Sequence, residues 1–171
     1  MPRSYFLILY GHLIFACFFI GGMSFFSILV KNLRKRLSPE EFAGEVVSIL
    51  RFYHPFILLC MGILIMSGAW YLTGVKIAMG PSFGALFVPL GLKLGVVFLA
   101  VMGLSFQFFG LGLRLTRGIG PSGNGRSISD GTDERLRLIS AVERSNFVNL
   151  IFALSAAFLG LSMSCLPISR I

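Results

Sequence analysis

Three ionisable side chains, His12, His54 and Lys93, lie within stretches of sequence that are otherwise apolar. An ionisable group is costly in hydrocarbon, so it usually faces the interior of a helix bundle and takes part in function. Imidazole is a good ligand of haem iron, and a lysine held away from water presents a neutral amine more readily than one in water. These residue types therefore point to a metal or haem site inside a membrane.

The expected depths of these side chains decide which of them can share a ligand. His12 stands about seven residues inside the outer boundary of its apolar stretch, roughly 10 Å down at the rise of an α-helix. Lys93 stands about six residues inside its own stretch from the same side, roughly 9 Å down. His54 enters from the opposite side, at a level that differs from that of His12 by roughly 15 Å. These depths exclude a haem held by both histidines and favour a haem with His12 and Lys93 as its metal ligands.

Simpler interpretations stay open for each residue. A lone buried histidine can form a hydrogen bond to a neighbouring helix, and Lys93 can extend its ammonium group toward the outer interface. Glycines near both positions leave room for a planar group, but glycines also let membrane helices pack closely. They are Gly11, Gly21, Gly22, Gly62, Gly68, Gly91 and Gly95. The coincidence of His12 and Lys93 at one level favours the haem.

His54 belongs to a second group of polar residues on the other side of the membrane. The residues expected at its level are Tyr53, Gln107, Asn146 and Asn149. This group could be a second haem site with an unidentified partner, a site for a quinone head group, or a layer of polar residues that bond one another, which we favour. Arg51 and Arg144 near the same boundary could hold haem propionates, although the topology of the chain also accounts for arginines there.

Four long apolar segments must position these side chains. The chain has 171 residues, of which 56% are hydrophobic and 13% charged, with a mean hydropathy of +0.86, as is typical of a multi-pass membrane protein. About 20 apolar residues cross the hydrocarbon, and the segments that reach this length are, approximately, residues 5–30, 52–72, 87–113 and 147–166. The sequence predicts an all-α integral membrane four-helix bundle in the lipid bilayer, with residues 1–171 as one domain.

The basic residues predict the orientation of the bundle. Most of the 15 Lys and Arg residues lie between the first and second segments or between the third and fourth. Because basic connections stay cytoplasmic, both termini are expected outside, in the periplasm, with the protein in the inner (cytoplasmic) membrane. Ser38, Pro39 and Glu41 predict a helix start that extends the second helix into the cytoplasm. Asp130 or Thr132 is expected to cap a similar extension of the fourth helix.

Other classes of function lack a signal in this sequence. There is no basic surface interleaved with aromatic residues, so no nucleic acid partner is expected. The glycines of "GIGPSGNG" lack the preceding strand and the Lys-Ser/Thr ending of a phosphate loop. The seven acidic residues all lie in the two basic connections, which argues against hydrolysis within the membrane. The cysteines share no short spacing that would indicate zinc or a disulfide framework.

The chain resembles the HemJ-type membrane protoporphyrinogen oxidases and the related CopD-type membrane proteins. His12, followed ten positions later by Gly22 and then by the basic "VKNLRKRL", is similar to their first helix. "ILRFYHPFILLCMGILIMSGAWYL" is similar to the second, and "PLGLKLGVVFLAVMGLSFQFFGLGLRL" to the third, with Lys93 at the position of the family's membrane lysine. The resemblance implies a four-helix fold, b-type haem, and His12 and Lys93 as the functional pair. Phe18 and Phe19 stand where the family has a Trp, and the last helix starts without the family's Asn-Glu pair and following Pro.

We therefore expect a haem b-binding protein of membrane electron transfer. It would act with other membrane redox subunits or as a homo-oligomer, and quinone is a further candidate partner. The alternatives are a HemJ-like oxidoreductase that oxidises protoporphyrinogen, a CopD-like copper transport protein, and a structural subunit without a cofactor.

Overall fold

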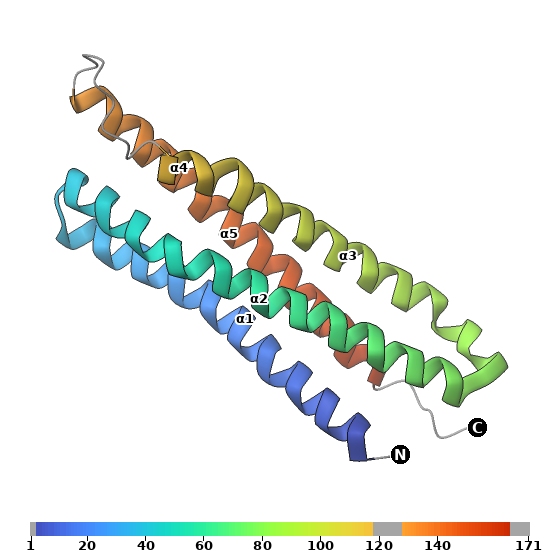
Figure 1. The fold of residues 1–171 in the computed structure, drawn as a ribbon. Helices are drawn as coiled ribbons and strands as arrows, with labels where there is room; N and C mark the ends of the chain where they lie inside the picture. Colours follow the sequence, from blue (N-terminus) through green and yellow to red (C-terminus); the bar gives the residue numbers. More distant parts are fainter. Residues whose placement is uncertain (1–2, 118–127, 165–171) are drawn as a thin grey trace.

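The protein is a bundle of long helices that run side by side (Figure 1). The computed structural model describes residues 3–117 and 128–164. Helices α1 (Arg3–Arg36) and α2 (Pro39–Met79) form a hairpin, and the 3-10 helix η1 (Gly80–Leu86) leads into α3 (Phe87–Ser105). The chain continues without a break through the π-helix η2 (Phe106–Gly112) into α4 (Leu113–Arg117), and α5 (Ile128–Ser164) returns along the bundle.

Within the described residues, four helices are long and apolar enough to cross a membrane. They are Phe6–Arg36, Pro39–Ile77, Phe87–Leu115 and Thr132–Ser162. The predicted all-α architecture with four membrane helices is therefore confirmed, and large apolar side chains exposed along every span indicate contact with the lipid bilayer. Residues 165–166 of the predicted fourth span lie outside the described part of the chain.

The two ends of the bundle differ in composition. The connection between α1 and α2 lies beside the start of α5, and we call this the basic end because Lys and Arg gather there (Figure 1). The start of α1, the helix η1 and the end of α5 lie together at the opposite end, which we call the terminal end (Figure 1). α1 packs most extensively on α2, α3 packs on α5, and α5 also contacts both helices of the hairpin.

At the basic end, the start of α2 agrees with the sequence-based prediction and the start of α5 does not. The backbone N–H of Ser38 donates to Glu41 Oε2 at 3.1 Å and the Ser38 hydroxyl donates to the same oxygen at 2.7 Å, so α2 begins at Pro39 as predicted. α5 begins at Ile128, which makes both Asp130 and Thr132 helical. The prediction that one of these two residues caps the helix was wrong, because the helix starts before either of them.

The buried apolar side chains of the spanning helices lie in the half of the bundle toward the basic end and in its middle, while Phe83 of η1 is buried at the terminal end. One cluster joins α1, α2, η2, α4 and α5 through residues such as Phe26, Val46 and Ile139. A second cluster lies nearer the middle, around Met23, Cys60 and Leu104. Each spanning helix has a last buried residue toward the terminal end, and the described side chains beyond it are all at least partly exposed. Those last positions are Phe19 on α1, Met61 on α2, Ala100 on α3 and Ala153 on α5.

Candidate functional site

His12 of α1 forms a hydrogen bond across the hairpin to α2. Its Nδ1 lies 2.7 Å from Ser67 Oγ, and Ser67 Oγ lies 2.6 Å from the carbonyl oxygen of Ile63, one turn earlier on α2. A serine hydroxyl has one proton, and Ser67 uses it toward the Ile63 carbonyl, so its oxygen accepts the Nδ1–H of His12. The second ring nitrogen, Nε2, then carries a lone pair, and no described residue forms a hydrogen bond with it.

The bond to Ser67 confirms the simpler interpretation of His12, a hydrogen bond to a neighbouring helix. His12 does bond a neighbouring helix, but it uses only one ring nitrogen to do so. A histidine that ligates a metal usually donates its other N–H to a nearby acceptor, which fixes the tautomer and the orientation of the ring. The arrangement of His12 and Ser67 is of this kind. A Cβ added at Gly68 would lie 3.5 Å from His12 Cε1, so this glycine leaves room for the ring against α2.

Lys93 of α3 lies in the neighbourhood of His12. Its amine rests on α5, since a Cβ added at Gly160 would lie 2.9 Å from Lys93 Nζ. Gly103 of α3 packs against Asn149 of α5, so these two residues lie at one level. Lys93 lies ten residues from Gly103 toward the terminal end, and Gly160 lies eleven residues from Asn149 toward the same end. The amine therefore lies at the level of its own residue and does not extend toward the terminal end.

No described side chain of the four spanning helices is fully buried at the level of His12 and Lys93. The residues that approach one another there are all only half-buried: His12, Ser67, Gly68, Lys93 and Gly160. They lie between the last fully buried positions of the four helices and the terminal end. We call this group the His12 site. Its donor set is an imidazole with a free Nε2, supplied by α1, and a primary amine, supplied by α3. Gly68 of α2 and Gly160 of α5 lie behind these two groups.

The other predicted site residues lie elsewhere. Gly22 packs closely against α2, where a Cβ would lie 3.1 Å from Ile57 Cδ1, so it belongs to the packed half of the hairpin. Arg51 is exposed, and it precedes Ser67 by 16 residues of continuous helix, or about 24 Å. Arg144 is likewise exposed on the part of α5 near the basic end. Neither arginine reaches the His12 site, so both stay candidates only for a ligand near His54.

His54 lies in a layer of polar side chains in the packed half of the bundle. The prediction that the residues of this layer bond one another was right only in part, because His54 Nε2 has no hydrogen-bond partner among the described residues. Tyr53 donates to Asn146 Oδ1 at 2.5 Å. Asn146 Nδ2 donates to the carbonyl oxygen of Met23 and to Ser27 Oγ, both at 3.0 Å. His54 is 7% exposed, and its ring packs edge-on against Phe108 with the centroids 5.6 Å apart. His54 precedes Ser67 by 13 residues, about 20 Å along α2, so His12 and His54 do not share a ligand.

Two contributors to these sites, Ser67 and Ser27, were not singled out from the sequence. A signal for Ser67 existed, because α1 and α2 form a hairpin around residues 37–38 and pair antiparallel. In an antiparallel pair that turns at residues 37–38, position 12 lies opposite a stretch of α2 in which Ser67 is the nearest hydroxyl. Ser27 had no comparable signal, since a serine in an apolar helix more often bonds its own backbone, as Ser27 also does toward the Met23 carbonyl.

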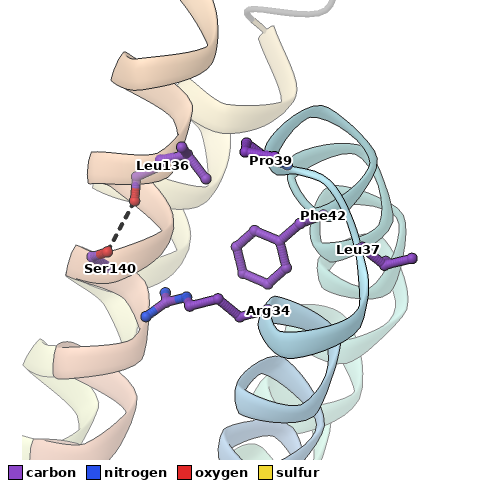
Figure 2. Close-up of a pocket in the computed structure, with 6 residues that line it drawn as sticks. All are labelled: Arg34, Leu37, Pro39, Phe42, Leu136 and Ser140. Carbon is purple, nitrogen blue, oxygen red and sulfur yellow. Dashed lines mark hydrogen bonds between the residues drawn. The ribbon is translucent and has the colours of Figure 1, made fainter.

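A shallow groove lies at the basic end, far from either site. It is lined by Arg34, Leu37, Pro39, Phe42, Leu136 and Ser140, and Figure 2 shows these side chains between the hairpin turn and α5. The Arg34 guanidinium lies 5.3 Å from the centre of the Phe42 ring and forms an ion pair with Glu143. Because its charge is already paired, the groove adds no titratable or ligating group to the sites above.

Comparison with protein-family models, with curated proteins and with solved structures finds no match for this chain.

Proposed function

We propose that the protein binds haem b at the His12 site and acts in electron transfer within a membrane. The observation that carries this proposal is the hydrogen bond of His12 Nδ1 to Ser67, which leaves the lone pair of Nε2 available to a metal. His12 would be the iron ligand on one face, and Lys93 would be either the second ligand or the residue that controls access to that position. Haem bound there would supply a centre that accepts and releases one electron.

The residues of the site fit such a group in chemistry and in space. Imidazole and amine nitrogens are both haem ligands, and no carboxylate among the described residues pairs with Lys93 and would hold it as an ammonium. Glycines stand behind both groups, and the helices carry no buried side chains at this level that a planar group would have to displace. Ser67 would hold the plane of the imidazole and increase its basicity toward the metal.

The orientation of the protein is part of the same proposal. The basic end would face the cytoplasm and the terminal end the periplasm, because basic connections are retained on the cytoplasmic side of the inner membrane. The His12 site would then lie in the outer leaflet. Its redox partner would be another membrane subunit, or a second copy of the chain that covers the open part of the bundle.

Absorption spectra of the purified full-length protein test the proposal. The protein would be produced with ample haem, and its spectra would be recorded oxidised and dithionite-reduced, with a pyridine haemochrome assay for stoichiometry. We expect a b-type spectrum with one haem per chain, absent from His12→Ala and retained in the matched control His54→Ala. Lys93→Met should keep the haem but change its coordination, seen as a shift of the Soret band.

Two results would contradict the proposal. A haem that is lost in His54→Ala but kept in His12→Ala would move the site to the polar layer. A protein without any Soret absorption would overturn haem binding altogether, and stoichiometric copper in that preparation would favour copper transport instead.

A further inference from the structure

The polar layer around His54 contains three buried atoms that have no hydrogen-bond partner. They are His54 Nε2, Gln107 Nε2 and Asn149 Oδ1. Gln107 is completely buried, Asn149 is 1% exposed and His54 is 7% exposed, so bulk water does not reach these atoms. Buried polar atoms are nearly always bonded to protein or to an ordered ligand, and three exceptions in one layer therefore require a cause.

Gln107 and Asn149 bond each other, and His54 packs beside the element that carries Gln107. Asn149 of α5 donates from Nδ2 to Gln107 Oε1 of η2 at 3.3 Å. The Cβ position of Gly112 lies 2.8 Å from His54 Cε1 and 3.4 Å from the carbonyl oxygen of Gln107, which places the ring of His54 beside the backbone of η2. A π-helix is rare and often marks a functional site, and η2 supplies both Gln107 and the glycine that receives His54.

The neighbouring half of the polar layer shows that the lack of hydrogen-bond partners is local. Asn146 bonds through both of its side-chain atoms, to Tyr53, to Ser27 and to the Met23 carbonyl. The same bundle can therefore satisfy a buried amide completely, at a position only three residues before Asn149. The unbonded atoms are confined to His54, Gln107 and Asn149.

The bonding capacity left over defines the chemistry of a ligand. The amide pair of Gln107 and Asn149 has one unused NH2 group, with two N–H donors, and one unused carbonyl oxygen. Rotating both amides by 180° exchanges the bonded and unbonded atoms, but it still leaves one NH2 group and one carbonyl oxygen. An imidazole nitrogen can donate or accept according to its tautomer. These unused donors and acceptors suit an atom that can both accept and donate a hydrogen bond, and the oxygen of an O–H group is such an atom.

We propose that His54, Gln107 and Asn149 form a buried binding site for a hydroxyl oxygen. The oxygen would accept a hydrogen bond from the unused amide NH2 group and donate its proton to the unused carbonyl oxygen or to the imidazole. Two sources carry this chemistry: a single internal water molecule, and the head group of a hydroquinone that enters from the bilayer. The site is independent of haem binding at His12.

Nuclear magnetic resonance of the full-length protein in deuterated detergent micelles distinguishes the two sources. Cross-relaxation between the water signal and the side-chain amide protons of Gln107 or the ring protons of His54 would identify an internal water. Saturable shifts of the same resonances on addition of decyl-benzohydroquinone, at one molecule per chain, would identify the head group. Either result supports the proposal, and neither requires haem to be present.

A matched pair of variants locates the effect. Gln107→Leu removes one partner of the ligand, so it should abolish the water signal or weaken hydroquinone binding by about tenfold, the loss expected for one hydrogen bond. Ser140→Ala removes a hydroxyl that bonds only its own helix, at the Leu136 carbonyl, and should change neither result. The proposal is overturned if the wild-type protein shows no contact with water and no response to hydroquinone at these resonances. The wild-type measurement gives this answer even if Gln107→Leu does not fold.

Discussion

The substitution Gly103→Ala tests directly how the bundle holds its polar layer. Gly103 of α3 faces Asn149 of α5, and a methyl group at this position would overlap the Asn149 side-chain amide. Its carbon would lie 3.1 Å from Cγ and 3.3 Å from Nδ2, with the amide oxygen closer still. Asn149 cannot keep its present position beside such a methyl, and moving it breaks its hydrogen bond to Gln107.

The expected cost follows from three contributions. Overpacking of a closely packed interior costs about 1–3 kcal/mol, and a lost hydrogen bond between membrane helices costs about 0.6 kcal/mol. Alanine in place of glycine stabilises a helix by about 0.8–1.0 kcal/mol, which opposes the other two. The net loss in the free energy of unfolding should therefore be about 1–3 kcal/mol.

Reversible unfolding in mixed detergent micelles measures this difference. The matched control is Gly62→Ala on α2, because an added Cβ at Gly62 meets nothing within 4 Å. Only the gain in helix propensity then remains, so Gly62→Ala should be neutral or more stable than the parent by up to about 1 kcal/mol. Equal stability of the two variants would refute the close packing of Gly103 against Asn149.

Three further predictions concern single contacts. Ser67→Ala should lower haem affinity by about 10- to 100-fold without abolishing binding, because the imidazole loses only the partner that orients it; transfer of haem to apomyoglobin measures this loss. Glu41 lies at the basic end, ahead of the apolar part of α2, and its carboxylate accepts two hydrogen bonds from Ser38. These bonds hold the pKa of Glu41 below its usual range. The resulting stabilisation is present above the pKa of an unfolded glutamate, about 4.3, and is lost as the pH falls through the lower folded value. Glu41→Gln should therefore melt below the parent at pH about 7, and the difference should shrink in acid below about pH 4. A double-mutant cycle on Arg34 and Glu143 should give a coupling under about 1 kcal/mol, because this ion pair is partly exposed to solvent.

The four membrane helices could be predicted because their signal is long and redundant. A run of some 20 apolar residues has few alternatives to a membrane helix, and the start of α2 was fixed by local chemistry at Ser38 and Glu41. The start of α5 could not be placed as well, since several polar residues from Ile128 onward fit a helix as readily as a connection. The π-helix at Phe106–Gly112 had no signal, because its residues are as apolar as those of the α-helix before it.

The candidate sites were predictable in composition but not in connectivity. Depth along a helix follows from residue number, which is why His12 and Lys93 could be assigned to one level. Which side chain bonds His12 depends on the rotation of α1 against α2, and a single sequence does not specify it. The sequence likewise predicted which polar residues share the level of His54, but not which of them bond. The bonded group around Asn146 and the unbonded group around Asn149 differ because of packing against Gly103 and Gly112.

The absence of buried side chains beyond Phe19, Met61, Ala100 and Ala153 in the described parts of the four spanning helices has a consequence for the order of assembly. The helices can separate at the terminal end without disturbing either cluster of buried residues, because both clusters lie toward the basic end and in the middle of the bundle. Lateral entry of a large flat molecule from the bilayer would then require no unfolding. Loading of the His12 site would be a step that follows folding, and the apoprotein would already have its complete transmembrane topology.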